Sequence, residues 1–220
     1  MERLVGVLVV VHMVLLLCIP ASADYNEVFN GSFLLGGEGW EYSESVLFNA
    51  GTGELIGGRE DVAYDPWPIP GACGSLRQII DNSLSPDWDP MLNHKIIDLW
   101  FDLYSFGNAY VVIGFDWWEY TGDEKPTGEA PFEELLVEQF TSPGQWNRIH
   151  VTYDFLDKPG TTWQPRWVSF EIAFFCSEQG DSSAVDEIVM QSKCVPEPSS
   201  LLAFAAAIGG LAGALYRRRR

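Results

Sequence analysis

The chain has 220 residues, of which 31 are Asp or Glu and 13 are Lys or Arg, so its formal net charge at pH 7 is −18. A surface this acidic repels nucleic acid and anionic lipid headgroups, which argues against a nucleic-acid partner. The chain also contains 9 Trp, 8 Tyr and 13 Phe. This aromatic content is enough to build a hydrophobic core and argues against a disordered acidic chain.

The N-terminus has the organisation of a secretory signal peptide. Arg3 precedes an apolar run over residues 4–19, and a small-residue triplet, Ala-Ser-Ala, ends at Ala23. This pattern predicts a signal peptide over residues 1–23 and therefore an exported protein. An uncleaved membrane anchor is the alternative.

Residues 24–194 are predicted to form one all-β domain, because hydrophobic and polar residues alternate there with the period of two that is typical of strands. Clusters rich in Gly, Pro, Asp and Ser separate the alternating segments. The predicted strands, in chain order, include 28–34, 75–80, 97–104, 111–118, 149–155, 167–174 and 185–191. One helical turn is expected around residues 132–138. Short strands with such turns predict an antiparallel β-sandwich.

The alternation also predicts which side chains point away from the core. If the aliphatic residues pack inward, the other face collects four aromatic residues: Trp100, Tyr104, Trp118 and Trp167. Carboxylates and one histidine share this face: Asp98, Asp102, Asp116, Asp154, Glu171 and His150. Rings beside carboxylates suit a sugar, because rings stack on apolar C–H surfaces while acids accept hydroxyl hydrogens. The alternative is that these residues pack under a loop or against another sheet.

A second candidate place for sugar binding is the loops at one edge of the domain. Three tryptophans lie in stretches rich in Pro, Gly and Asp: Trp40, Trp67 and Trp88. The sequence alone does not choose between the loops and the strand face.

Three cysteines remain after signal-peptide removal: Cys73, Cys176 and Cys194. Export permits a disulfide, and an odd number leaves one thiol over. Cys176 and Cys194 flank an expected hairpin at unequal distances from its turn, so we favour a Cys73–Cys176 disulfide. Three free thiols are the alternative.

No sequence motif in the domain indicates catalysis. His94 and His150 are its two histidines, and neither accompanies a G-x-S-x-G element. The domain lacks a phosphate-binding loop, H-E-x-x-H and C-x-x-C. A pair of acids for glycoside hydrolysis is uninformative in a chain with so many carboxylates. The protein is therefore expected not to be an enzyme.

The C-terminus combines three features in a fixed order. Pro196, Glu197 and Pro198 precede an uncharged apolar run over 201–215, and four arginines end the chain. This order resembles the PEP-CTERM sorting signal of exported bacterial proteins. The resemblance implies a sorting region over residues 195–220, with cleavage near the Pro-Glu-Pro motif by an exosortase.

The apolar part of this region is long enough to serve as a membrane anchor. The segment 199–216 would span about 27 Å as a helix, close to the roughly 30 Å of a bilayer core. The arginines after it would stay on the cytoplasmic side. The helix is expected to be a transient anchor, with a permanent tail anchor as the alternative.

A second resemblance comes from short motifs spread along the domain. Asn30-Gly31-Ser32-Phe33, Gly39-Trp40, the strand 74–80 and Ala184-Val185-Asp186-Glu187-Ile188 occur in that order. They resemble the galactose-binding-like jelly rolls, a group that includes many carbohydrate-binding modules. The resemblance implies a jelly-roll sandwich whose first and last strands meet.

A structural calcium often sits at that meeting point in this group. The resemblance implies Asp186 as a calcium ligand, with Glu38 replacing the glutamate usual at the position of Leu34. The alternative is that Asp186 only accepts hydrogen bonds from backbone donors.

Together these features predict an exported, non-catalytic protein of the bacterial surface or extracellular matrix that binds polysaccharide. A purely structural surface protein without a ligand and a glycan hydrolase are the alternatives.

Overall fold

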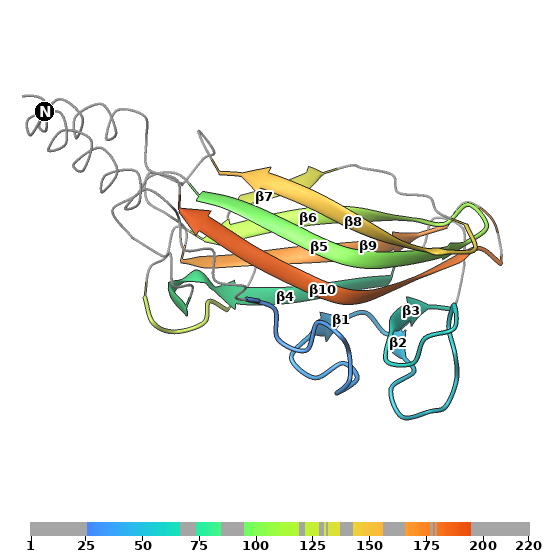
Figure 1. The fold of residues 1–220 in the computed structure, drawn as a ribbon. Helices are drawn as coiled ribbons and strands as arrows, with labels where there is room; N and C mark the ends of the chain where they lie inside the picture. The colour runs from blue at the N-terminus through green and yellow to red at the C-terminus, as the bar shows by residue number, and fades with distance from the viewer. Residues whose placement is uncertain are drawn as a thin grey trace, which may run out of the picture.

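The computed structural model describes residues 26–66, 74–84, 95–118, 122–127, 130, 132–136, 143–155, 166–176, 178 and 180–194. Within them, two antiparallel five-stranded sheets pack face to face as a β-sandwich (Figure 1), which confirms the predicted fold class. One sheet, here called the front sheet, has the order β2 (Leu47–Phe48), β3 (Ala63–Asp65), β10 (Ser182–Cys194), β5 (Lys95–Phe106), β8 (Trp146–Asp154). The back sheet has the order β1 (Glu41–Tyr42), β4 (Gly74–Asp81), β9 (Trp167–Phe175), β6 (Tyr110–Trp118), β7 (Phe132–Leu136).

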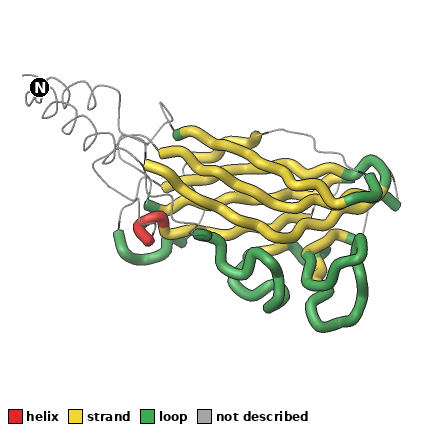
Figure 2. Tube along the Cα trace, in the orientation of Figure 1, coloured by secondary structure: helices red, strands yellow, loops and turns green. Residues whose placement is uncertain are grey.

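Strands β10, β5 and β8 run in front of β9 and β6 in Figure 1. A short 3₁₀ turn, η1 (Asn82–Leu84), follows β4. Figure 2 shows that the loops 26–40 and 49–62 lie along the same long edge of the sandwich.

The core lies between the sheets and contains the side chains that alternation predicted to face inward. The inward residues of β5, β6 and β9 are at most 3% exposed: Ile97, Leu99, Phe101, Leu103, Val111, Ile113, Phe115, Trp117, Val168, Phe170, Ile172 and Phe174. Burying one such large apolar side chain contributes about 1.5–3 kcal/mol. The period-two pattern therefore predicts the hydrophobic face of these three strands correctly.

The segment 28–34 is a series of turns, so its prediction as a strand is wrong. Asn30 and Phe33 have φ angles of 52° and 51°, in the left-handed region that a strand does not use. The segment still lies against the last strand, because the amide of Ile188 donates to the Gly31 carbonyl at 2.9 Å. A Cβ on Gly31 would lie 2.0 Å from the Ile188 oxygen, so this contact requires glycine.

The expected helical turn at 132–138 is also wrong, because residues 132–136 form strand β7. β7 pairs with β6 along five register positions, from Phe132 opposite Trp117 to Leu136 opposite Ile113. Backbone pairing with a neighbouring strand overrides a weak local helical pattern here.

Strand β10 contains a β-bulge beside its pairing with β5. The register shifts between Asp186 and Val189, and Glu187 has a φ of 50°. The extra residue lets Val185 and Ile188 both face the core, with exposures of 0% and 1%. It also leaves Asp186 on the outer side of the front sheet, opposite Asp102.

Several predictions fall on parts of the chain outside the described residues. These are the signal peptide 1–23, the sorting region 195–220 with its helix 199–216, and the side chains of Trp67, Trp88 and Cys73. Among the residues that are described, no helix is both long enough and apolar enough to cross a membrane.

Candidate functional site

The four aromatic residues predicted to share one face lie on two faces. Trp100 and Tyr104 belong to β5 in the front sheet, whereas Trp118 and Trp167 are paired on β6 and β9 in the back sheet. Outer faces of the two sheets of a sandwich point in opposite directions. Alternation separates inward from outward residues, but it does not say to which sheet a strand belongs.

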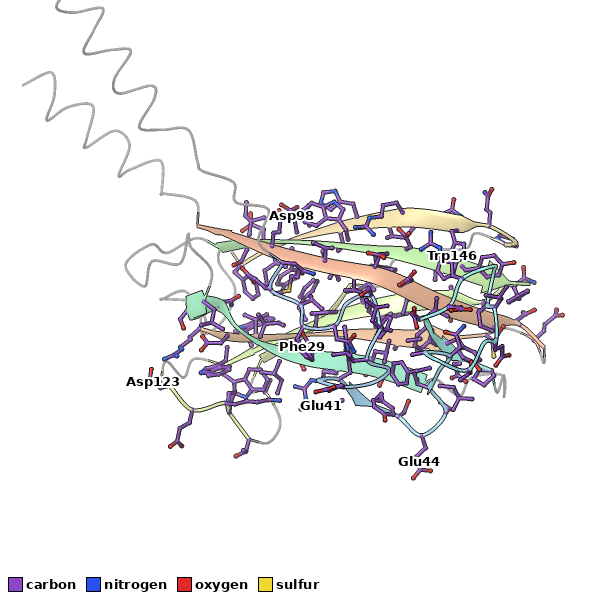
Figure 3. All side chains as sticks on the ribbon, turned by 60° about the horizontal axis from the view of Figure 1, so that its bottom comes forward. Phe29, Glu41, Glu44, Asp98, Asp123 and Trp146 are labelled. Atoms are coloured by element: carbon purple, nitrogen blue, oxygen red, sulfur yellow. The ribbon has the colours of Figure 1, made fainter. Side chains whose placement is uncertain are left out.

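The side-chain view makes the two faces visible. Figure 3 shows Asp98 and Trp146 on the side of the front sheet, with Glu41 and Asp123 on the opposite side. The two faces are therefore separate candidate surfaces.

The outer face of the back sheet keeps its tryptophans covered. Trp118 and Trp167 are only 5% and 6% exposed, and the Trp167 indole Nε1 donates to the Gly122 carbonyl at 2.9 Å. Arg166, next to Trp167, also forms an ion pair with Asp123 of the same loop. Trp167 packs under this loop, which is the alternative considered from the sequence, and both rings offer little surface to a sugar.

Trp100 on the front sheet stacks on a histidine. The Trp100 and His150 rings lie 4.7 Å apart with an interplanar angle of 7°. His150 Nε2 contacts Asp98 Oδ1 at 2.8 Å, and Thr152 Oγ1 donates to the same oxygen at 2.7 Å. Trp100 remains partly exposed, so the front face offers a supported aromatic surface.

A second aromatic pair lies further along the same face. Tyr104 is opposite Trp146 in the β5–β8 register, and their ring centroids are 5.4 Å apart. The Trp146 indole Nε1 donates to the Gly57 carbonyl at 2.9 Å. Gly57 has a φ of 56°, and a Cβ there would lie 2.8 Å from both rings, so glycine permits this close approach.

Trp146 was missed in the sequence because the predicted strand began at residue 149. The strand begins at Trp146 instead. Extending the alternation by two outward positions, from His150 through Arg148 to Trp146, would have found it.

A row of charged side chains lies between the two aromatic pairs. We call Arg59, Asp102, Arg148 and Asp186 the charged row. Arg59 Nη1 donates to Asp102 Oδ2 at 2.8 Å and to Asp186 Oδ2 at 2.9 Å. Arg148 Nη1 donates to Asp102 Oδ1 at 3.0 Å and to the Glu187 carbonyl at 2.8 Å. Asp102 therefore holds both guanidinium groups.

Two carboxylates opposite each other on neighbouring strands repel, and the arginines offset this repulsion. Burial raises the pKa of Asp186 above its ordinary value, and hydrogen bonds from Arg59 and the Glu187 amide only partly oppose that shift. The bulge at Glu187 thus positions both a carboxylate and a carbonyl in the charged row.

The predicted calcium ligands lie on different elements, Asp186 on β10 and Glu38 in the loop 26–40. Asp186 accepts hydrogen bonds from Arg59 and from the Glu187 amide at 2.7 Å, while Glu38 is exposed in the loop 26–40. The Glu38 carbonyl accepts from the Asn30 side-chain amide at 3.2 Å. Among the described residues, no group of three or more His, Cys, Asp or Glu side chains is placed to hold a metal ion.

Trp40, predicted as a loop platform, is part of the core. It is 6% exposed, and its ring lies 5.3 Å from Phe33 and 5.7 Å from Phe170. Its indole Nε1 donates to the Asn30 carbonyl at 3.2 Å. Trp40 therefore packs the N-terminal loop against β9 of the back sheet.

Cys176 directly follows β9 and is partly buried. Burial raises the pKa of its thiol, and the nearby charges of Asp181 and Asp65 raise it further. Its predicted disulfide partner, Cys73, lies outside the described residues.

Comparison with known protein families decides the nature of the C-terminus. A family model described as the PEP-CTERM protein-sorting motif matches residues 195–220. The chain ends in a PEP-CTERM sorting motif. The PEP-CTERM motif marks the protein as exported and sorted to the cell surface, and it implies processing by an exosortase. The resemblance based on Pro196, Glu197 and Pro198 is confirmed.

The β-sandwich is similar in fold to several solved structures. The active domain of bacteriophage CBA120 tailspike protein 4 aligns with a TM-score of 0.48 and 14% identity, over 77% of this chain but only 22% of the tailspike. The module TmCBM61, solved with β-1,4-galactotriose, aligns with a TM-score of 0.46 and 14% identity, over 76% of this chain and 98% of the module. A family 16 carbohydrate-binding module aligns with a TM-score of 0.45 and 15% identity, over 76% of this chain and 99% of the module. No curated protein matches the sequence of this PEP-CTERM chain.

Proposed function

We propose that this exported PEP-CTERM protein binds extracellular polysaccharide, without catalysis, through the outer face of the front sheet of a jelly-roll sandwich. The observation that supports it is the arrangement of two aromatic pairs on one face with the charged row between them. Trp100 and Tyr104 are four residues apart on β5, which places them about 13 Å apart along the strand. A face of this length suits several sugar rings of a polymer.

The chemistry of the face fits the recognition of sugars. Trp100 and Trp146 are partly exposed rings that can stack on C–H surfaces. The side chains between them are hydrogen-bond donors and acceptors held in place by one another. Such prepaired groups reduce the entropy lost on binding.

The same geometry favours a binding role over hydrolysis. A glycosidase needs a carboxylic acid that reaches the glycosidic oxygen and a second carboxylate at a set distance. The Asp102 and Asp186 carboxylates accept from arginine donors and are only 15% and 8% exposed. In this proposal they hold Arg59 and do not transfer a proton to a ligand.

The two ends of the chain account for the delivery of the protein to the cell surface. In this proposal, residues 1–23 direct export, and the helix 199–216 anchors the protein in the membrane until an exosortase processes the PEP-CTERM motif. Calcium is a further proposal, tested by comparing binding with calcium and with a chelator.

The test is affinity electrophoresis of the full chain, in mild detergent, through gels that contain single polysaccharides. Trp100→Ala should weaken binding about tenfold or more, because an aromatic anchor carries a large share of the binding energy. Tyr42→Ala is the matched control, since Tyr42 is 51% exposed but lies on β1 of the back sheet. Thermal midpoints of both variants verify that they are folded.

Three outcomes would contradict the proposal. Equal losses in the two variants would show that the front face is not the binding surface. No retardation of the wild type by any polysaccharide would favour a purely structural surface protein. Release of reducing ends from a retarding glycan would show that the protein is a hydrolase.

A further inference from the structure

The charged row presents its cations to solvent and keeps its carboxylates underneath. The side chains of Arg59 and Arg148 are 33% and 45% exposed, whereas those of Asp102 and Asp186 are 15% and 8% exposed. In the next row a more exposed ring also lies over a buried carboxylate, since the side chains of His150 and Asp98 are 48% and 8% exposed. The chain has a net charge of −18, yet a ligand approaching this face meets guanidinium groups first.

Each guanidinium uses one nitrogen to bind the protein. Nη1 of Arg59 donates to Asp102 and Asp186, and Nη1 of Arg148 donates to Asp102 and the Glu187 carbonyl. Within the described part of the chain, the Nε and Nη2 groups of Arg59 and Arg148 have no hydrogen-bond acceptor. A guanidinium has five N–H donors, so three remain on each arginine. The Nε and Nη2 edge is a fork that matches a carboxylate with two parallel hydrogen bonds.

Both arginines are held in place before any ligand arrives. The Arg59 guanidinium carbon lies 4.2 Å from the centre of the Trp146 ring, a stacked cation–π contact. Arg148 is tied to Asp102 on one strand and to the bulge of β10 on another. Ordering a long, flexible side chain costs free energy on binding, and here much of that cost is met by folding.

We infer that the charged row binds a carboxylated polysaccharide, with Arg59 and Arg148 pairing with uronate carboxylates while the flanking aromatic pairs contact the sugar rings. This inference rests on the proposed function and names its ligand class. At physiological ionic strength the Debye length is about 8 Å, so repulsion from distant acidic residues is screened while contacts in the row are not.

The test compares one polymer with and without its charge. Binding of the full chain to polygalacturonate and to alginate is measured at physiological ionic strength against the methyl-esterified form of each polymer. A chelator is present so that calcium cannot bridge carboxylates. The wild type should bind an acidic form at least about tenfold more tightly than its ester, the size expected for a bidentate charged contact.

Arg148→Gln should remove this preference, because the affinity for the acidic polymer should fall by about tenfold, to the level of the ester. Lys125→Gln is the matched control, because it removes the same charge at a side chain that is 54% exposed and paired with Glu41 of the back sheet. It should keep the preference for the acidic polymer. The thermal midpoints of both variants are compared with that of the wild type.

The outcomes separate this inference from the proposed function. Equal affinity for acid and ester, or binding to neutral glycans alone, overturns the acidic ligand class and leaves polysaccharide binding in place. A preference that survives Arg148→Gln overturns the role of the charged row. No binding to any acidic, esterified or neutral polymer overturns the inference and the proposed function together.

Discussion

At the scale of single residues, Asp81 shows how one carboxylate is kept charged at the end of the back sheet. Arg166 donates from Nε to Oδ1 at 3.0 Å and from Nη2 to Oδ2 at 2.9 Å, and the Ser83 amide donates to Oδ1 at 3.0 Å. Burial acts to raise the pKa of Asp81, but these hydrogen bonds outweigh it and the pKa lies below its ordinary value. The folded state therefore favours the ionised form.

This shift predicts a pH-dependent contribution to stability. Because the folded pKa is lowered, ionised Asp81 stabilises the fold at pH values above its unfolded pKa, near 3.8, and the contribution disappears as the pH falls through the folded pKa. Asp81→Asn should lower the urea midpoint at neutral pH, and its difference from the wild type should shrink in acid. Asp123→Asn is the control, because Asp123 also contacts Arg166 but is 97% exposed. If the urea midpoint of Asp81→Asn were lower than that of the wild type by the same amount at every pH, the charge of Asp81 would not be the cause of the difference.

At the scale of elements, the bulge in β10 places a non-glycine residue in a left-handed conformation. Glu187 has a φ of 50° and is exposed, while its neighbours Asp186 and Ile188 are buried. A left-handed conformation costs about 1–2 kcal/mol for a residue with a Cβ. The pairing of β10 with β5 on both sides of the bulge holds Glu187 in that conformation.

Two glycine substitutions in this strand should have opposite effects. Glu187→Gly should stabilise the fold by about 1 kcal/mol, because glycine adopts positive φ without a steric cost. Val189→Gly should destabilise it by about 1 kcal/mol or more, because glycine weakens a regular strand and removes a partly buried side chain. Urea unfolding of both variants measures the difference. If Glu187→Gly destabilises as Val189→Gly does, the bulge is not strained.

Strands could be predicted from the sequence where apolar and polar residues alternate with a period of two. β5, β6, β8 and β9 are long and have one apolar face, so their pattern is unambiguous. The segment 28–34 contains four apolar residues, but two of its residues are left-handed, which the sequence pattern does not reveal. The segment 132–136 became a strand through pairing with β6, which local sequence does not encode.

The candidate site was only partly predictable for a related reason. Trp100, Tyr104, Asp102 and His150 were assigned to an outer face, and the structure places them together on the front sheet. The assignment of Trp118 and Trp167 to the same surface failed because strand order is a tertiary property. Arg59 comes from a loop, and no periodic pattern links a loop residue to the strand residues that it contacts.

At the scale of the whole molecule, the proposed binding sheet leads directly into the sorting signal. β10 carries Asp186 of the charged row and ends at Cys194, and the PEP-CTERM motif begins at residue 195. The remaining acidic surface keeps an exported domain soluble. One strand, β10, therefore contributes to the charged row and connects the front sheet to the sorting motif.

The central claim is that polysaccharide occupies the outer face of the front sheet, and hydroxyl-radical footprinting of the full chain tests it most directly. With a bound glycan, oxidation of Trp100, Tyr104 and Trp146 should fall. Oxidation of Tyr42 and Phe29, which are 51% and 52% exposed away from this face, should not change. Protection of Tyr42 or Phe29 with no change at Trp100, while the glycan is bound, would contradict the account.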